Sequence, residues 1–217
     1  MADRAALVKG VVLASTSPWR RDLLASTGVE FSVAAADVDE SQIQHAEPGT
    51  LAILRARAKA SAVAAASPGQ LVIGADQTLS IDGDMLRKAK DESEARAQLS
   101  RLAGRTHWLH SAFSLSYAES PQSTPRNLHA EVIDVAMSMR ALSEPEISAL
   151  VATGDWRGSV GSYKIERSGV HLFAKAAADS SAIVGLPLCE LLAALRRLGI
   201  NPLLAPKPPW TIKVEPA

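Results

Sequence analysis

The residues best suited to bind phosphate stand at the start of an expected helix, in the stretch LASTSPWRRDLL at 13–24. A Ser-Pro pair is a typical helix start, and the unpaired N–H groups of a helix N-terminus attract anions. Ser15 adds a hydroxyl group, while Arg20 and Arg21 add guanidinium groups that bind phosphate oxygens in pairs. The stretch therefore indicates a polyphosphate site, although the pattern alone fits a capped surface helix with solvated arginines equally well.

Carboxylates and lysines follow at separate places in the chain. Asp76 ends the expected strand LVIGAD, where a carboxylate can hold a divalent cation or accept a proton from water. A turn-forming aspartate that bonds its own backbone is the more frequent interpretation of that pattern alone. Asp39 and Glu40 form a second acidic point after another expected strand. Lys59, on an alanine-rich helix, and Lys88, after a hairpin, are of a type more often solvated than bound to phosphate.

The sequence does not indicate a site built from histidine or cysteine. His107 and His110 are three apart on an expected strand, so their side chains should face opposite sides of it. Cys189 stands among leucines, which predicts a core position. As the only cysteine, it excludes an internal disulfide and a cysteine-based metal cluster. The sequence contains no HExxH, P-loop, GxGxxG or GxSxG motif.

Composition limits the class of protein. The chain has 217 residues, of which 47% are hydrophobic and 21% charged, and its formal net charge is +0. These values are typical of a globular protein, and the length allows one domain or two small lobes that share a cleft. The neutral charge gives no indication of a nucleic-acid or membrane partner, and no apolar stretch reaches the length of a membrane span. The single cysteine fits a reducing compartment, so we expect a cytoplasmic protein.

Expected strands and helices alternate along the chain. Strands are predicted at 8–15, 31–40, 71–81, 106–117 and 131–142. Helices are predicted at 18–28, 50–66, 91–104, 143–154 and 185–200. Asp82-Gly83 is a hairpin signal, and residues 160–178 should contain a turn and a strand. Because a hairpin occurs among the alternating elements, we expect a mixed sheet rather than a parallel one.

Several short stretches, in this order, resemble the Maf family of nucleoside triphosphate pyrophosphatases. The resemblance extends from Val11 to Ile200 and rests on LASTSPWRRDLL, VDE (38–40), KA (59–60), VIGADQT (72–78), RKAKD (87–91), LSEPEI (142–147), GSYKIE (161–166) and VGLPL (184–188). It implies an α/β fold with a mixed twisted sheet and two lobes around a deep cleft, as in Maf and ITPase proteins. Residues 1–205 would form one domain, followed by a proline-rich tail at 206–217 that either packs as extended chain or is disordered.

The resemblance also implies a reaction and its residues. The reaction is hydrolysis between the α- and β-phosphates, which yields a nucleoside monophosphate and pyrophosphate. Asp76 is the implied proton acceptor for the attacking water. The positions implied to line the substrate cleft are Ser15, Arg20, Glu40, Lys59 and Lys88. Glu40 and Asp76 could together hold a divalent cation, Mg²⁺ or Mn²⁺, which suits oxygen ligands and phosphates.

Three positions resemble the branch of the family that hydrolyses 7-methyl-GTP. Many members have arginine, threonine and glutamine where this chain has Trp19, Gln77 and Glu166. N7-methylguanine carries a positive charge, which the face of a tryptophan attracts. A glutamate can accept hydrogen bonds from the guanine N1–H and exocyclic amine, and Gln77 could bond a remaining base or ribose edge. The set therefore favours a methylated guanine nucleotide as substrate.

The sequence leaves other interpretations open. Trp19 could pack inward with Leu23, and Glu166 could form an ion pair with a neighbouring basic residue. RKA at 87–89 stands where the family usually has GKP, which keeps Lys88 but puts the shape of its loop in doubt. The protein could instead be a nucleotide-binding regulator of cell division with incidental or no hydrolysis, or an RNA cap-binding module. The resemblance also suggests a homodimer.

Overall fold

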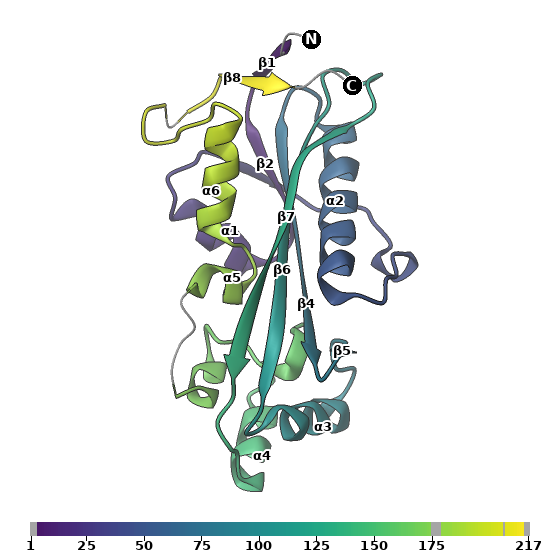
Figure 1. Cartoon of the computed structure of the whole chain (residues 1–217), viewed down its shortest axis with the longest axis vertical. Helices are drawn as coiled ribbons and strands as arrows, with labels where there is room; N and C mark the ends of the chain where they lie inside the picture. Colours follow the sequence, from purple (N-terminus) through teal and green to yellow (C-terminus); the bar gives the residue numbers. More distant parts are fainter. Residues whose placement is uncertain (1–3, 175–178, 206, 215–217) are drawn as a thin grey trace.

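A mixed β-sheet forms the centre of the molecule (Figure 1). The computed structural model of the chain describes residues 4–174, 179–205 and 207–214. The strands of this sheet are β2 (Val11–Ala14), β3 (Ser32–Ala34), β4 (Leu71–Ile81), β5 (Asp84–Leu86), β6 (Thr106–Tyr117) and β7 (Arg126–Ser138). They lie in the order β3-β2-β4-β6-β7, with β5 on β4. β2 is parallel to β3 and β4, and the other pairs are antiparallel, which confirms the predicted mixed sheet.

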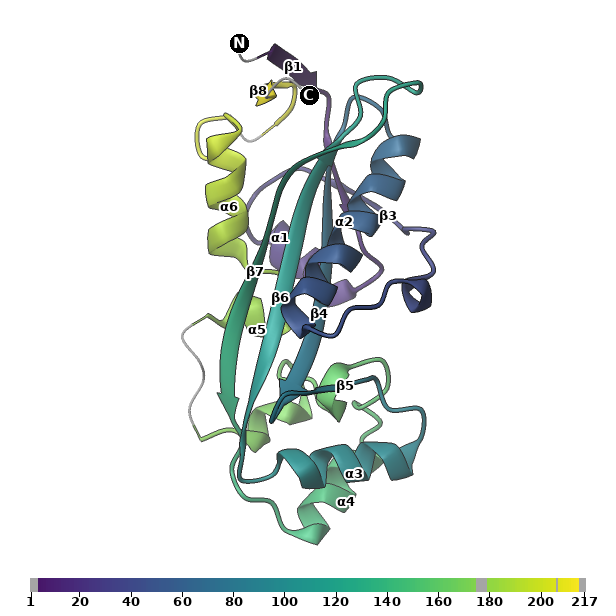
Figure 2. The ribbon, with the colours of Figure 1, turned by 45° about the vertical axis from the view of Figure 1, so that its right-hand side comes forward.

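Helices cover both faces of the sheet (Figures 1 and 2). The helices are α1 (Pro18–Ala25), α2 (Pro48–Ala66), α3 (Glu92–Leu102), α4 (Glu144–Ala152), α5 (Ser180–Val184) and α6 (Leu188–Arg197). α2 packs on one face, while α1 and α6 pack on the other. α3 and α4 lie side by side at one end of the long strands β4 and β6. In the described part of the chain, no helix has the length and apolar character that crossing a bilayer requires.

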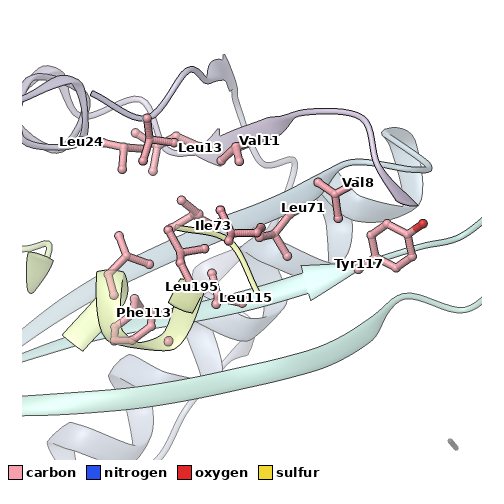
Figure 3. Close-up of a cluster of buried hydrophobic side chains, with 14 of the residues drawn as sticks. Val8, Val11, Leu13, Leu24, Leu71, Ile73, Phe113, Leu115, Tyr117 and Leu195 are labelled. Atoms are coloured by element: carbon pink, nitrogen blue, oxygen red, sulfur yellow. The ribbon is translucent and has the colours of Figure 1, made fainter. Parts of the chain in front are cut away.

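The hydrophobic core has two main clusters, one in each lobe. The first joins the sheet to α1 and α6, and its buried members include Leu13, Ile73, Phe113 and Leu195 (Figure 3). The second joins the far ends of the strands to α3 and α4, with Leu99 among its fully buried side chains. Burial of apolar surface in each cluster stabilises its own lobe, by about 25 cal/mol for each Å² removed from water. The predicted two-lobed arrangement is therefore visible in the packing.

Local signals placed most elements correctly. α1 begins at Pro18 with Ser17 as N-cap, as predicted. The Asp82-Gly83 hairpin connects β4 to β5. The helix expected at 143–154 forms as α4, with Ser143 and Glu146 as a capping box. β6 has the bounds that its sequence pattern predicted.

Other predicted elements were wrong in extent or type. The strand expected at 8–15 is divided into β1 (Arg4–Val8) and β2, which belong to different sheets, and the one expected at 31–40 is reduced to β3. The strand expected within 160–178 is absent from its described residues 160–174, which form short 3₁₀ helices at Val160–Ser162 and Ser168–Leu172. Only a single bridge, from Phe173 to Met139, resembles a strand there.

The proline-rich tail contains a strand. β8 (Trp210–Val214) pairs antiparallel with β1, at the opposite end of the molecule from α3 and α4 (Figure 2). Trp210 and Ile212 are buried in the first core cluster. Residues 210–214 therefore pack as extended chain, which was one of the two expectations for this tail.

The backbone of α2 lies unusually close to β4. The helix is rich in alanine, and Ala52, Ala56 and Ala60 are fully buried along the side that faces the sheet. Opposite them, β4 carries Gly74, where a Cβ atom would lie 2.2 Å from the carbonyl oxygen of Ala56 and 2.8 Å from the amide nitrogen of Ala60. Any side chain at Gly74 would therefore push α2, with its Lys59, away from the sheet.

We expect the variant Gly74→Ala to be less stable by about 1–3 kcal/mol, the usual cost of overpacking a core. Its melting temperature, measured by circular dichroism, should fall by about 2–12 °C for a chain of this size. Gly10→Ala is the control, because its new Cβ would meet only the flexible end of the Gln70 side chain, 3.2 Å away. Equal melting of the two variants would contradict the close approach at Gly74.

Candidate active site

A cavity of about 1260 Å³ opens between the two lobes. It is lined by the start of α1, the loop after β3, α2, β4, the segment at 157–167 and α5. The nine residues that the family resemblance implied for the site all line this cavity, namely Ser15, Trp19, Arg20, Glu40, Lys59, Asp76, Gln77, Lys88 and Glu166. The structure therefore brings together residues that are up to 151 positions apart, from Ser15 to Glu166.

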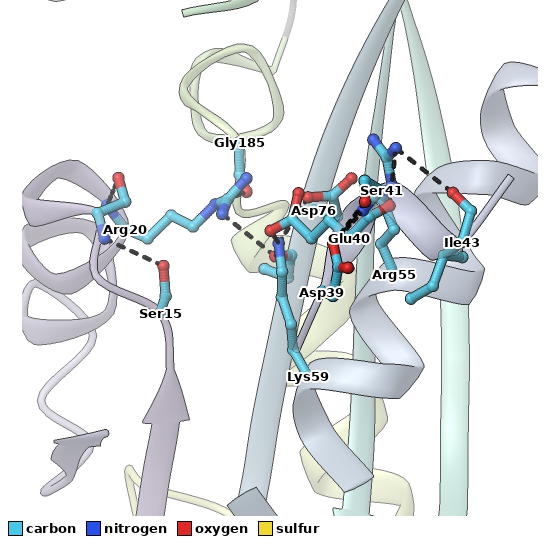
Figure 4. Close-up of polar contacts among 12 residues, drawn as sticks. Ser15, Arg20, Asp39, Glu40, Ser41, Ile43, Arg55, Lys59, Asp76 and Gly185 are labelled. Atoms are coloured by element: carbon cyan, nitrogen blue, oxygen red, sulfur yellow. Dashed lines mark hydrogen bonds and ion pairs between the residues drawn. The ribbon is translucent and has the colours of Figure 1, made fainter. Parts of the chain in front are cut away.

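Lys59 joins two carboxylates at the centre of the site (Figure 4). Its Nζ atom lies 2.7 Å from Oδ1 of Asp76 and 2.8 Å from Oε1 of Glu40. Lys59 comes from α2, Asp76 from β4 and Glu40 from the 3₁₀ helix Glu40–Gln42. The Oδ2 atom of Asp76 is buried and, among the described residues, has no hydrogen-bond partner. A buried acceptor without a partner is costly, so this oxygen is available to a ligand.

The charges around Glu40 favour its ionised form. Burial acts to raise the pKa of Glu40, but the hydrogen bond and charge of Lys59 act against it. The charges of Lys88 and Arg55 act in the same direction, and the pKa of Glu40 lies below its ordinary value as a result. Lys88 itself is exposed at the rim of the cavity. The site therefore keeps a carboxylate ionised among several cations.

Arg20 connects the start of α1 to β4 and to the residue that follows α5. Its Nε donates to the carbonyl oxygen of Gly185 at 2.8 Å, and its Nη1 donates to that of Ala75 at 3.2 Å. Burial lowers the pKa of Arg20, and the charges of Asp76 and Glu40 oppose that shift. Arg20 is thus held in place by backbone carbonyls next to the two carboxylates.

The rest of the helix start is only partly as predicted. The side chain of Ser17 accepts from the amide of Arg20, and Oγ of Ser15 accepts from the amide of Ser17 at 3.2 Å. Arg21, considered with Arg20 as a phosphate ligand, lies outside the cavity lining and pairs with Asp22 on the surface. One arginine of the pair therefore belongs to the site.

Trp19 and Glu166 face the cavity from opposite lobes. Trp19 is half-buried at the wall, while Leu23, one turn later, packs against the first core cluster. The alternative in which Trp19 packs inward is therefore not what the structure shows. Glu166 is also half-buried, and among the described contacts it has no ion pair, because Lys164 donates to the carbonyl of Arg157 instead. Burial raises the pKa of Glu166 above its ordinary value of 4.5, against the smaller effect of the charges of Lys164 and Arg167.

Gln77 is tied to the protein by its amide nitrogen. This atom donates to Oγ of Ser111 at 2.7 Å and to the carbonyl oxygens of Ala182 and Ile183 at 3.1 and 3.0 Å. Since an amide nitrogen has two hydrogens, these contacts leave it no capacity to donate to a ligand. Any direct contact from Gln77 to a base or ribose would therefore use its Oε1 atom as acceptor.

Sequence reasoning missed four arginines that line the cavity, namely Arg55, Arg87, Arg157 and Arg167. Arg55 lies one helical turn before Lys59 and donates to the carbonyl oxygens of Glu40 and Ile43. The i, i+4 spacing from Lys59 was a signal for it. Arg157 and Arg167 come from an irregular segment and had no comparable signal.

His107, His110 and Cys189 lie outside the cavity lining, whereas His45 is part of it. His107 contacts the hydroxyl group of Tyr163, and burial lowers its pKa to about 4. His110 faces the other side of the sheet, between Ser80 and Asp134, so the predicted opposite orientation is confirmed. Cys189 is exposed on α6 rather than in the core, because it lies on the outward side of an amphipathic helix.

The carboxylates of the cavity could bind a cation only together with oxygen atoms of a ligand or of water. No group of three or more histidine, cysteine, aspartate or glutamate side chains in the described ranges could hold a metal ion by itself. Asp76 and Glu40 do offer carboxylate oxygens on one wall, and Oδ2 of Asp76 is unpartnered there. Two carboxylates plus phosphate oxygens and water form a normal Mg²⁺ or Mn²⁺ site, so the residues fit such an ion.

Comparisons with known proteins identify relatives that span most of the chain. The family model of Maf-like proteins matches residues 10–198. A nucleoside triphosphate pyrophosphatase of Bradyrhizobium diazoefficiens is 43% identical over 192 residues, which cover 86% of this chain and 92% of the relative. A 7-methyl-GTP pyrophosphatase of Brucella abortus is 41% identical over 195 residues, covering 86% and 95%. Among solved structures, a HAM1 protein from Coxiella burnetii is 16% identical with a TM-score of 0.43, covering 86% of this chain and 98% of that one.

We expect Glu166→Gln to raise the melting temperature at pH 7, because burial disfavours the ionised carboxylate. The penalty in the wild type is complete only above the raised pKa of the folded state, so it should shrink as the pH falls from there toward 4.5, the value in the unfolded chain. Melting curves between pH 4 and pH 8 measure the difference. Glu30→Gln, which changes an exposed carboxylate, should show no such trend. A difference that does not depend on pH would contradict this account.

Proposed function

The chain belongs to the family of Maf-like proteins, and we propose that it is a nucleoside triphosphate pyrophosphatase. The products are a nucleoside monophosphate and pyrophosphate. The observation that carries the proposal is the group formed by Lys59, Asp76 and Glu40, which places an unpartnered carboxylate oxygen among cations in a cavity between lobes. Relatives named as nucleoside triphosphate pyrophosphatases support the same activity.

Asp76 is the proposed proton acceptor. Lys59 holds Oδ1 of Asp76, which leaves Oδ2 to orient an attacking water and take its proton. The water oxygen bonds to the α-phosphorus as the bond from that phosphorus to the bridging oxygen breaks. Pyrophosphate leaves with the electron pair of that bond. The ion pair with Lys59 thus positions the Asp76 carboxylate, and its unpaired Oδ2 atom accepts the proton.

Positive groups around Asp76 balance the charge of the triphosphate. Lys88 at the rim, Arg20 on the wall and the N-terminus of α1 all lie on the cavity, where they can stabilise negative charge on phosphoryl oxygens. Asp76 and Glu40 would hold Mg²⁺ or Mn²⁺, which when bound supplies a Lewis acid for the phosphate oxygens. Ser15 adds a hydroxyl group beside the same helix start.

We further propose that 7-methyl-GTP is the preferred substrate. Trp19 offers an aromatic face to a positively charged base. Glu166 has no ion pair among the described contacts, so its carboxylate can accept from guanine N1–H and the exocyclic amine. The Brucella abortus relative is named a 7-methyl-GTP pyrophosphatase, at an identity similar to that of relatives with the broader name. The side chains in the cavity, rather than overall identity, therefore support this choice.

The alternatives have less support. A regulator of cell division without hydrolysis would not need the arrangement of Asp76, Lys59 and Lys88, and the relatives carry the names of enzymes. An RNA cap-binding module would need a basic path for RNA, which the net charge of +0 does not indicate. The single cysteine supports a cytoplasmic location as a further proposal.

We expect Asp76→Asn to lower kcat for pyrophosphate release by at least about 100-fold, since an amide cannot accept the proton. Pyrophosphate release from 7-methyl-GTP and GTP, in the presence of Mg²⁺ or Mn²⁺, measures the effect. Asp22→Asn, which changes an exposed carboxylate on α1, should retain wild-type activity. If Asp76→Asn is folded and fully active, Asp76 is not the base.

We expect Trp19→Arg to lower kcat/KM for 7-methyl-GTP more than for GTP. The loss of the cation–π contact and the added like charge should change the ratio by roughly 2- to 30-fold. Steady-state kinetics with both nucleotides give the ratio directly. An equal loss for both would show that Trp19 acts through packing rather than through the charge of the base.

A further inference from the structure

The aromatic face of Trp19 already has a protein cation on it. The guanidinium carbon of Arg167 lies 5.5 Å from the centre of the Trp19 ring, and both side chains line the cavity. This distance is within the range in which a cation is attracted to the face of an aromatic ring. Arg167 therefore makes the same kind of contact that a positively charged base would make at this ring.

Arg167 also has an alternative partner. Its Nη1 lies 3.4 Å from Oδ1 of Asp155, a buried carboxylate that also accepts from the amide and hydroxyl groups of Ser168. The Arg167 side chain is 56% exposed, so its guanidinium group can move away from the ring of Trp19 without disturbing buried side chains. A displaced Arg167 would keep its ion pair with Asp155 and remain near the base.

We propose that Arg167 competes with the positively charged base for Trp19 and so limits the preference for 7-methylguanine. This inference rests on the proposed function. A cationic base must displace the guanidinium and then stay close to it, which adds repulsion between like charges. Neutral guanine must displace the same group but meets no such repulsion. Arg167 is thus a specificity-determining residue whose positive charge disfavours the positively charged base.

The variant Arg167→Gln tests this inference, because glutamine keeps a polar side chain toward Asp155 and removes the charge. The ratio of kcat/KM for 7-methyl-GTP to that for GTP should rise roughly 3- to 30-fold, the size of the repulsion between two unit charges a few ångströms apart in a partly solvated cavity. Both nucleotides carry a triphosphate, so the ratio cancels any loss of phosphate binding. The dissociation constants of the two nucleotides, measured by calorimetry in the Asp76→Asn background, should change in the same ratio.

Arg157→Gln is the matched control. Arg157 also lines the cavity and also stacks on a tryptophan, at 4.4 Å from the ring of Trp156, but that ring is buried in the second core cluster. Removing its charge frees no surface for the base, so the ratio should stay at the wild-type value. If both arginine variants raise the ratio equally, the general charge of the cavity controls selectivity and the inference fails.

A double-mutant cycle with Trp19→Ala separates the contact from the charge. In that background no ring holds the base beside Arg167, so the repulsion weakens and Arg167→Gln should change the ratio much less than it does beside an intact Trp19. An undiminished effect would overturn the inference. Failure of the proposed function is distinguishable, since a wild-type protein that releases no pyrophosphate from either nucleotide would refute the activity, while the binding ratio still reports on Arg167.

Discussion

The ion pairs of Lys59 are the contacts on which the site depends. Two carboxylates from separate segments would repel each other on one wall of a cavity, and the ammonium group between them allows Asp76 and Glu40 to converge. The position of Lys59 depends in turn on the absence of a side chain at Gly74, which lets the α2 backbone approach β4. The absence of a side chain at Gly74 thus allows Lys59 to pair with Asp76, two positions further along β4.

The sequence predicted elements whose signals are local. The cap at Ser17, the hairpin at Asp82-Gly83 and the pattern of β6 each depend on neighbouring residues, and each forms as expected. The segment after Val160 was misjudged because Gly161 and Ser162 adopt left-handed backbone conformations, with φ of 74° and 63°, and its fold depends on distant contacts. β8 could not be assigned with certainty because its partner strand lies at the other end of the chain.

The sequence named side chains that line the cavity, but it did not predict their contacts with one another. The family resemblance named nine of the residues that line the cavity, but not Arg55, Arg157 or Arg167. It could not show that the amide of Gln77 is committed to Ala182 and Ile183, or that Arg20 is held by carbonyl oxygens. The stacking of Arg167 on Trp19 joins residues 148 positions apart, and nothing in the order of the chain indicates it.

The pairing of β1 with β8 has a consequence for how the molecule is made. Trp210 and Ile212 fill the first core cluster, although they are synthesised about 200 residues after Val8, their neighbour in that cluster. Contacts between such distant segments form late, because closing a long loop costs entropy before any contact repays it. Until residues 210–214 have been synthesised and have left the exit tunnel, the first core cluster lacks two of its buried side chains, and the apolar surface that they cover stays exposed to water.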